Sequence, residues 1–391
     1  MKRLISCVLA LLYVMAGFAS GTWILHGKEY RVDTLYHAYI GPGTTQTSIK
    51  LAGPVNLRVF YTTTDLKNEN VDVRAIKHKD TLTGLGTVSN AAESHSTSNR
   101  SYFAGINADF FSSSMPCGIT VVDGEVYCSD QASGWSLFGI DANKIPYSGG
   151  GDFYVKLTAP DYSAMNLERG TNGLVLYSSR KGANTGTDSN GSEVVLIPDG
   201  EGNFLTPGAT VRMRVQGNPS HAGSMPIPDN GYILSGSGTK ESFVSNLSEG
   251  DVVEVRCAIR FNGFTGGKIQ QALGGCPMLV SGGKVLDTEN ALDHLTSAQP
   301  RTAVGYNAEK NKLVMLVADG RSSISVGPIS KVLADIMIYA GCSEAMNFDG
   351  GGSSTFYVKG EGVINQPSDG SERSVTDGLY LSTDAAQNDV T

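Results

Sequence analysis

Short runs of alternating apolar and polar residues, separated by glycine-rich turns, occupy most of the chain. Residues 47–51, 57–61 and 71–76 alternate in this way, which is typical of strands with one buried face. Residues 312–318 are almost continuously apolar and predict a fully buried strand. Asp123-Gly124 between two such runs predicts a tight hairpin. The pattern therefore indicates mainly antiparallel sheets.

Two segments follow a helical period instead. Pro328 and Gly341 stand at the two ends of the stronger one, as expected for the first turn and the residue after a helix. Its apolar stripe predicts a helix packed on a sheet and consists of Ile329, Val332, Leu333, Ile336, Met337 and Ala340. A second, short helix is predicted from Thr87 to about His95.

Length and composition extend this picture to the whole chain. The 391 residues include 48 glycines, which favours a β-rich fold with many turns. We predict an α+β fold of mainly antiparallel sheets with a few packed helices. No long linker interrupts the chain after residue 21, so residues 22–100 are expected to form one domain with the core at 101–385.

The N-terminus has the features of a secretory signal peptide. Lys2 and Arg3 precede the apolar run 4–18, and Ala19-Ser20-Gly21 supplies small residues for cleavage. We therefore predict that residues 1–21 are removed and that the protein is periplasmic or secreted. No later segment is apolar for long enough to span a membrane.

The net charge argues against nucleic acid as a partner. It is −8 for the chain and −10 without residues 1–21, because that segment carries Lys2 and Arg3 but no acidic residue. Binding to nucleic acid depends on neutralising phosphates, which an acidic protein does poorly.

The cysteines are interpreted as structural. Five follow residue 21, and none forms a Cys-x-x-Cys motif, so their spacing matches no metal site. Cys117 and Cys128 flank the predicted Asp123-Gly124 hairpin and could close it by a disulfide in an oxidising compartment.

Polar residues at predicted strand ends are the candidates for chemistry. Asn107 and Asp109 share one side of a strand that runs into two phenylalanines, a combination that suits a sugar ring or, alternatively, caps its own turn. Asp349 enters the turn Gly350-Gly351-Gly352, which resembles either an oxyanion nest or an ordinary hairpin turn.

Arginines and carboxylates accompany this turn between residues 300 and 382. Arg301, Asp319 and Arg321 stand at predicted strand ends, and Glu372 and Arg373 lie in a loop. Guanidinium groups bind phosphate oxygens in a bidentate fashion, and carboxylates serve acid–base chemistry. A structural salt-bridge network is the alternative.

Five segments in this order resemble the phosphodiester glycosidase family, whose mammalian member removes N-acetylglucosamine from a phosphodiester. The motifs are residues 105–111, 300–305, 319–321, 347–355 and 371–373, and weaker matches extend from about residue 36 to the end. The resemblance implies a hydrolase that cleaves a GlcNAc-like sugar from a glycosyl 1-phosphodiester, with a phosphorylated glycan or sugar phosphodiester as its partner.

The resemblance and the residue types together suggest roles. Arg301, with Arg321 or Arg373, would bind the phosphate together with the N–H groups of residues 350–352 and the hydroxyls of Ser353 and Ser354, with Thr355 beside them. Asp349 would stabilise or attack the anomeric carbon, and Glu372 would be the general acid or base. Asp319 would orient Arg301 or a water, and Asn107 and Asp109 would hold sugar hydroxyls.

Two departures from the family pattern affect the identity of the substrate. Relatives often have Asn-Gly-Gly-Phe-Phe where this chain has residues 107–111 with Asp109, and a Val-Ala-Asn-like stretch where it has Ser374-Val375-Thr376-Asp377. No cofactor is expected, although Asp109, Asp319 and Asp349 could hold a Ca²⁺-like ion. The alternatives to the phosphodiester glycosidase are a non-catalytic carbohydrate-binding protein and an enzyme acting on envelope or extracellular polysaccharide.

Overall fold

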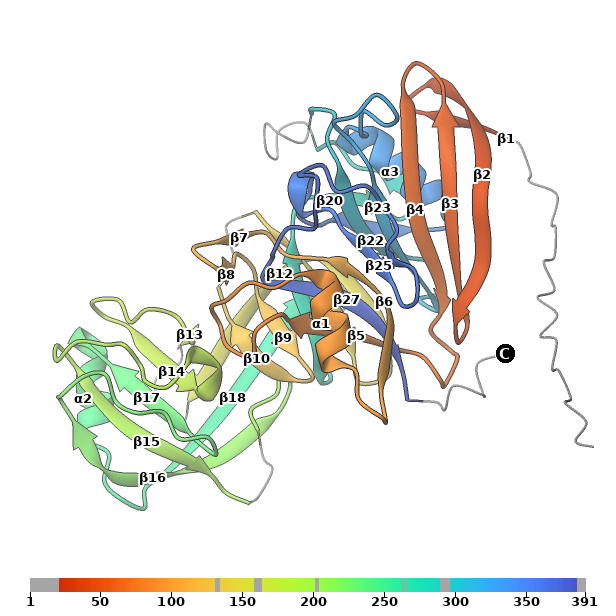
Figure 1. Cartoon of the computed structure of the whole chain (residues 1–391). Helices are drawn as coiled ribbons and strands as arrows, with labels where there is room; N and C mark the ends of the chain where they lie inside the picture. Colours follow the sequence, from red (N-terminus) through yellow and green to blue (C-terminus); the bar gives the residue numbers. More distant parts are fainter. Residues whose placement is uncertain are drawn as a thin grey trace, which may run out of the picture.

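A computed structural model describes residues 21–130, 134–157, 164–200, 204–261, 264, 266–288 and 296–384. The predicted signal peptide, apart from Gly21, lies outside these residues. Three large sheets contain most of the strands, and each sheet joins segments that are distant in the sequence (Figure 1).

The first sheet has nine strands and carries the longer of the two predicted helices. In spatial order its strands are β1 (Gly21–Leu25), β2 (Lys28–Gly41), β3 (Thr44–Ala52), β4 (Asn56–Asp65), β23 (Lys312–Ala318), β22 (Arg301–Tyr306), β24 (Glu344–Asn347), β20 (Met278–Ser281) and β21 (Lys284–Val285). Helix α3 (Ser330–Tyr339) buries Leu333, Ile336 and Met337 against this sheet. The predicted stripe is thus confirmed as core.

The second sheet has five strands and lies beside the first. Its order is β26 (Gly362–Val363), β25 (Phe356–Val358), β6 (Ser101–Asn107), β27 (Asp377–Thr383) and β5 (Asp72–Lys77). Helix α1 (Val88–His95) packs on it through Val88, Ala91 and Ala92, and the hydroxyl of its N-cap Thr87 accepts a hydrogen bond from the Asn90 N–H. The predicted short helix is therefore also confirmed.

The third sheet has eleven strands and extends into a separate-looking lobe, drawn in green in Figure 1. Its order is β10 (Glu125–Cys128), β9 (Thr120–Val122), β19 (Ile269–Gly275), β11 (Ser136–Asp141), β12 (Pro146–Leu157), β18 (Val252–Phe261), β16 (Thr210–Ser220), β15 (Ser192–Pro198), β17 (Tyr232–Gly236), β14 (Leu174–Ser178) and β13 (Ala164–Met165). The lobe also contains α2 (Glu241–Ser245) and the short 3₁₀ helices η1 (Ser179–Lys181) and η2 (Gly238–Lys240). The hairpin predicted at Asp123-Gly124 joins β9 and β10. A further two-stranded ribbon pairs β7 (Phe111–Ser112) with β8 (Met115–Pro116).

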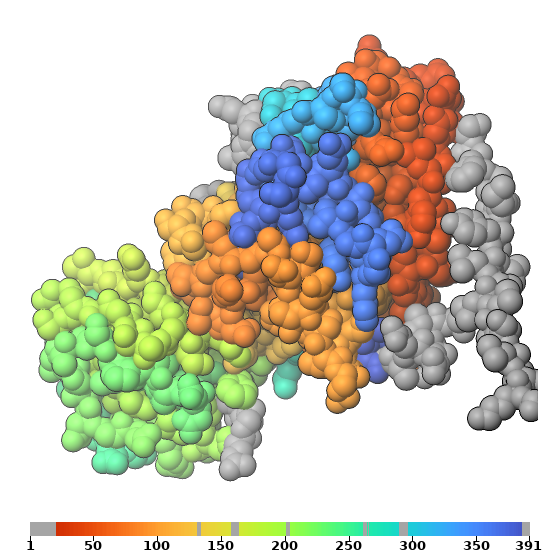
Figure 2. All heavy atoms as spheres, viewed as in Figure 1, coloured from red at the N-terminus to blue at the C-terminus, as the bar shows by residue number. Residues whose placement is uncertain are grey.

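One hydrophobic core joins the three sheets. It includes Ile106 from the second sheet, Phe138 from the third and Val304 from the first, together with Phe348, whose ring meets that of Phe138 edge to face at 6.5 Å. Figure 2 shows the α1–β6 segment (orange) and the C-terminal segment (blue) as one continuous surface. The strand ends above this core carry the candidate site.

The predicted fold class needs one correction. The antiparallel sheets with few helices are confirmed, but strands account for 49% and helices for only 9%, so the fold is mostly β rather than a balanced α+β. The single-domain organisation stays a prediction. No helix in the described ranges is long and apolar enough to cross a membrane.

Candidate active site

Three aspartates meet where strands of two sheets end. Asp109 lies just beyond β6, Asp349 just beyond β24, and Asp377 is the first residue of β27. The Asp349 N–H donates to the Ala108 carbonyl at 2.8 Å, and the Asp109 N–H donates to Oδ1 of Asp377 at 2.9 Å. Three backbone segments far apart in the sequence therefore hold three carboxyl groups in one place.

Asp349 is the partly exposed member of this group. Burial raises the pKa of its carboxyl to about 6, against the lowering effect of hydrogen bonds from the Ser353 hydroxyl and the Gly350 N–H and of the Arg373 charge. The negative charge of Asp377 adds to the rise. A carboxyl that titrates near neutrality suits acid–base or charge-stabilising work.

Asp109 lies deeper, against two glycines. Its Oδ2 accepts the Gly118 N–H at 2.8 Å, whereas its Oδ1 is buried and has no hydrogen-bond partner. A side chain on Gly118 or Gly274 would collide with this carboxyl group. Burial, followed by the charge of Asp377, raises the pKa of Asp109 well above its usual range.

Asp377 is fully buried, and sequence reasoning noted it only as a departure from the family pattern. Its Oδ2 accepts the Thr376 hydroxyl at 2.9 Å, in addition to the Asp109 N–H on Oδ1. Lys77 stands opposite it across the β27–β5 pair. Burial raises the pKa of Asp377, and the Lys77 charge opposes that rise.

In the glycine turn, N–H groups that an oxyanion nest would leave free for a ligand are hydrogen-bonded within the protein. Residues Gly351–Ser353 form the 3₁₀ turn η4, and the Gly351 N–H donates to the Pro300 carbonyl at 2.9 Å. The Gly350 N–H binds the Asp349 carboxylate. These two N–H groups are therefore not available to a phosphate in this conformation, which corrects the role predicted for them.

Asn107 lies behind the turn and holds it in place. Its Nδ2 donates to the Asp349 carbonyl at 2.7 Å, while its Oδ1 accepts the Thr302 hydroxyl and the Thr355 N–H. The Thr302 hydroxyl also lies 3.2 Å from the Ser354 hydroxyl. Asn107 is fully buried. It therefore supports Asp349 instead of facing a sugar, contrary to the predicted role.

Two of the three candidate arginines lie over the glycine turn. The guanidinium of Arg321 lies against Gly351, where an added Cβ would be 2.9 Å from its Nη2, and that of Arg373 lies against Gly352. Nη1 of Arg373 is 3.4 Å from the Ser353 hydroxyl, and its Nη2 pairs with Asp369 at 2.6 Å. Both arginines are exposed.

Arg301 is buried beneath them. Its guanidinium donates to the carbonyls of Pro328 at 3.3 Å and Ser297 at 2.7 Å. Burial and the nearby Arg321 charge lower its pKa to about 10, so it remains positively charged at neutral pH. Arg301 therefore contributes positive charge from below the turn.

The carboxylates of Glu372 and Asp319 form hydrogen bonds with other parts of the chain and not with Asp349. The Glu372 carboxylate accepts the N–H and hydroxyl of Ser89 at 2.8 and 2.5 Å in the first turn of α1, a favourable place for negative charge. Oδ1 of Asp319 accepts the Asn365 amide and the Gln366 N–H, and Asn365 in turn binds the Ser354 carbonyl. Both carboxylates thus hold surrounding loops, and the general acid or base role predicted for Glu372 does not fit this geometry.

Two neighbours of the aspartates could not be assigned from sequence. The partly exposed Cys117 has a pKa raised to about 11 by burial and then by the charges of Asp109, Asp349, Asp130 and Asp377. The rings of Phe110 and Trp135, both partly exposed, meet edge to face at 5.0 Å. The aromatic pair beside the site is therefore Phe110 with Trp135 rather than Phe110 with Phe111.

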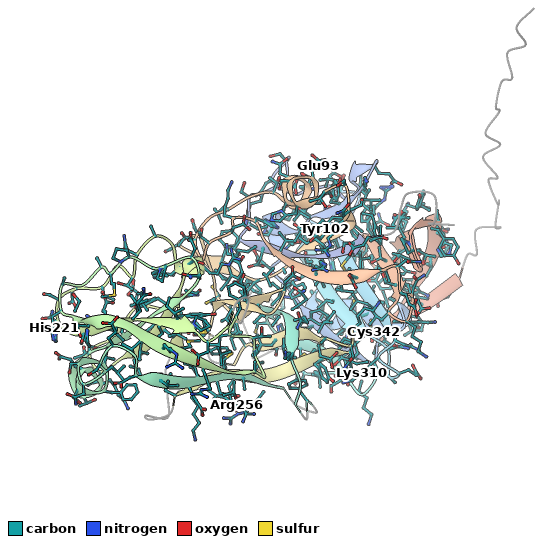
Figure 3. The ribbon with its side chains drawn as sticks, turned by 90° about the horizontal axis from the view of Figure 1, so that it is seen from below. Glu93, Tyr102, His221, Arg256, Lys310 and Cys342 are labelled. Atoms are coloured by element: carbon teal, nitrogen blue, oxygen red, sulfur yellow. The ribbon has the colours of Figure 1, made fainter. Side chains whose placement is uncertain are left out.

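The described cysteines are all free thiols: Cys117, Cys128, Cys257, Cys276 and Cys342. The hairpin disulfide considered from sequence does not form, because Cys128 stands opposite Thr120 in the β9–β10 pair and Cys117 lies beyond the start of β9. Figure 3 shows Cys342 far from the lobe tip where His221 lies, so the two are not part of one site.

Metal ligation finds no support among the residues that the structure describes. No group of three His, Cys, Asp or Glu side chains in these residues is placed to hold an ion. Asp319 in particular points to Asn365 and Gln366, as described above, and not to the Asp109–Asp349 cluster.

Substituting Asp349 by asparagine is expected to stabilise the fold at pH 8 by about 1–2 kcal/mol. A carboxyl with a raised folded-state pKa binds its proton more tightly when folded, so its contribution is favourable below pH 4 and is lost as the pH rises through about 6. Thermal unfolding at pH 4, 6 and 8 measures the difference, which should vanish at pH 4. Asp384→Asn is the control, because Arg100 lowers the pKa of that carboxyl; a destabilised Asp349→Asn protein at pH 8 would contradict the assignment.

Comparisons with known proteins agree with the sequence motifs. Residues 207–382 match the family model for phosphodiester glycosidase. Over 88 residues the chain is 40% identical to the SPbeta prophage-derived uncharacterized protein YomE of Bacillus subtilis (strain 168), a match that covers 22% of this chain and only 13% of YomE.

Solved structures share the fold over most of the chain. A hypothetical protein from Synechocystis has a TM-score of 0.65 at 15% identity, covering 87% of this chain and 62% of that protein. A candidate exported protein from Burkholderia pseudomallei K96243 has a TM-score of 0.65 at 17% identity, covering 93% and 99%. The zebrafish N-acetylglucosamine-1-phosphodiester alpha-N-acetylglucosaminidase catalytic domain, auto-inhibited by its pro-peptide, has 12% identity over 90% of this chain and 87% of that chain, but its TM-score of 0.47 is too low to establish a common fold.

The family match contains Arg301, Asp349 and Asp377, three of the residues that build the site. Residues 207–382 are therefore similar in sequence to the phosphodiester glycosidase family, in agreement with the motifs.

Proposed function

We propose that the protein hydrolyses glycosyl 1-phosphodiesters and releases a GlcNAc-like sugar. The observation that carries the proposal is the position of Asp349, whose carboxyl has a pKa of about 6, beside a glycine turn covered by the guanidinium groups of Arg321 and Arg373. The carboxylate suits the anomeric carbon of such a substrate, which becomes positive during cleavage. The two exposed cations suit its negative phosphate.

In the proposed reaction water attacks the anomeric carbon, the bond from that carbon to the phosphate oxygen breaks, and a phosphate monoester leaves. The leaving group needs little protonation, so a dedicated acid such as Glu372 is not required. Asp349 is mostly ionised at pH 7 and supplies negative charge to the oxocarbenium-like centre. Charge stabilisation of this kind acts strongly in a partly buried site.

Arg321 and Arg373 are the proposed phosphate ligands, and Arg301 strengthens the positive potential beneath them. The positive charge of Arg321 lowers the pKa of Arg301, so Arg301 and Arg321 repel each other. A phosphate bound near both guanidinium groups would relieve that repulsion. The partly exposed rings of Phe110, which follows Asp109, and Trp135 offer apolar contacts for the face of a sugar.

Replacing Arg321 by alanine should lower kcat/KM for a GlcNAc-1-phosphodiester roughly a hundredfold, since a charge-assisted bidentate bond is lost. An uncharged aryl N-acetylglucosaminide should lose little, because it has no phosphate to bind. Arg321→Lys should recover part of the loss, as lysine keeps the charge without the planar fork. Equal losses on both substrates would contradict a phosphate contact.

The decisive test of the function itself is a panel of glycosyl phosphodiesters and plain glycosides. Release of sugar from phosphodiesters alone supports the proposal. Turnover of plain oligosaccharides at a similar rate would favour an enzyme of envelope or extracellular polysaccharide, and binding without turnover would favour a carbohydrate-binding protein. We further propose that the protein acts outside the cytoplasm, in line with the candidate signal peptide.

A further inference from the structure

A chain of backbone and side-chain contacts connects Asp377 to Asp349. Oδ1 of Asp377 accepts the N–H of Asp109 at 2.9 Å. One peptide earlier, the Ala108 carbonyl accepts the N–H of Asp349 at 2.8 Å. The segment between β6 and β7 is therefore fixed on one side by Asp377 and itself fixes the backbone of Asp349 on the other.

Asp377 is itself held firmly. It is fully buried, its Oδ2 accepts the Thr376 hydroxyl, and it stands at the first position of β27 opposite Lys77 of β5. The Lys77 ammonium is also buried and donates to the carbonyls of Gly84 and Thr376 at 3.2 and 3.1 Å. A carboxyl in this place has a fixed orientation, and the nearby Lys77 cation favours its ionised form against the effect of burial.

We propose that Asp377 is a positioning residue for the proposed glycosidic cleavage: it holds the Ala108-Asp109 segment, to which the Asp349 backbone is bound, and places a negative charge behind the Asp349 carboxyl. The inference rests on the proposed function for its catalytic consequence. Asp377 itself does not contact the substrate, because its side chain is entirely covered by protein.

The charges around Asp349 and Asp377 indicate how the charge of Asp377 changes the pKa of Asp349. The charged and titratable groups near Asp349 and Asp377 are Arg373, Asp109, Lys77, Cys117, Cys128 and Tyr380. Among these, Arg373 lowers the pKa of Asp349 while Asp377 raises it. Removing the Asp377 charge removes one of the influences that raise the pKa of Asp349, while burial remains, so this pKa should fall below about 6.

Two substitutions separate the charge from the hydrogen bond. Asp377→Asn keeps an oxygen that accepts the Asp109 N–H but removes the charge, whereas Asp377→Ala removes both. With Asp377→Asn, the acidic limb of the kcat/KM profile on a GlcNAc-1-phosphodiester should move to lower pH, while the rate on the plateau changes little compared with Asp377→Ala. With Asp377→Ala, kcat on the plateau should fall roughly a hundredfold, because Asp349 loses its placement.

A second readout does not depend on activity. The Asp349 carboxyl carbon is titrated by NMR in ¹³C-labelled wild type and Asp377→Asn, with the assignment given by Asp349→Asn. Asp384→Asn is the matched control, since the exposed Asp384 follows the opposite end of the same strand and pairs with Arg100. A lower Asp349 pKa in Asp377→Asn but not in the control supports the inference even if no phosphodiester is cleaved, in which case only the proposed function fails. An unchanged Asp349 pKa in folded Asp377→Asn, or a full plateau rate in Asp377→Ala, would overturn it.

Discussion

Replacing Asp349 by asparagine is expected to lower kcat/KM on a glycosyl 1-phosphodiester by roughly a thousandfold, or about 4 kcal/mol of transition-state stabilisation. Asparagine has nearly the same shape, and its amide oxygen can still accept hydrogen bonds from Ser353 and Gly350. What it lacks is the negative charge that the positive anomeric centre requires. Steady-state kinetics between pH 5 and pH 8 measure the loss, which should be largest above pH 6, where the wild-type carboxyl is ionised.

Misfolding cannot account for this loss if the stability prediction for the same variant also holds. Asp349→Asn should be more stable than wild type at pH 8 while being far less active. Asp369→Asn offers a nearby comparison, since that carboxylate also lies against Gly352 and pairs with Arg373, but is not the group proposed to stabilise the anomeric carbon. A smaller loss for Asp369→Asn than for Asp349→Asn is expected, and full activity of Asp349→Asn would rule out the central role of this carboxylate.

Replacing Lys77 by methionine is expected to lower the free energy of unfolding at pH 8 by about 3–5 kcal/mol. Lys77 and Asp377 are both fully buried, and without the ammonium group the carboxylate of Asp377 has lost its nearby cation. Asp377 would then hold its proton in the folded protein, with a folded-state pKa above that of the unfolded chain. Stability contributed in this way is present at low pH and lost as the pH rises, so the defect should be smaller at pH 5 than at pH 8.

Urea denaturation of Lys77→Met at both pH values measures this effect. The double variant Lys77→Met/Asp377→Asn is the matched partner, because it removes both charges while keeping similar shapes. It should recover part of the stability at pH 8, since replacing both partners leaves no uncompensated charge. A double variant that is less stable than Lys77→Met would show that the two residues do not compensate each other.

Most of the fold was predictable from local patterns. The stripe from Ile329 to Ala340 requires a helix on a sheet, and α3 packs in this way. Residues 312–318 form β23 over the predicted range. The correction to a mostly β fold concerns the balance of elements, because sequence patterns indicate the type of a segment better than the total share of helix.

The structure brings together several of the residues that the sequence singled out, but it gives others different contacts from those expected. Asp349 and Arg321 were expected at strand ends and Arg373 in a loop, and in the structure both arginines lie against the glycine turn that follows Asp349. Glu372 was misassigned, since nothing in its own sequence context reveals that the first turn of α1, nearly 300 residues earlier, receives its carboxylate. Asp377 was missed for a similar reason: its contact with Asp109 depends on the register between β6 and β27, which pairs Gly378 with Asn107.

The glycines around Asp109 limit how this site can be redesigned. Gly118 and Gly274 approach each other so closely that a methyl group on Gly118 would lie 2.6 Å from the Gly274 backbone, and both lie against the Asp109 carboxyl. The space is thus shared among three positions on three different segments. A larger side chain at Gly118, Gly274 or Asp109 requires the other two residues to move or to become smaller, so the three positions must be varied together. In a library that varies Asp109 alone, most larger side chains would collide with Gly118 or Gly274 and destabilise the fold.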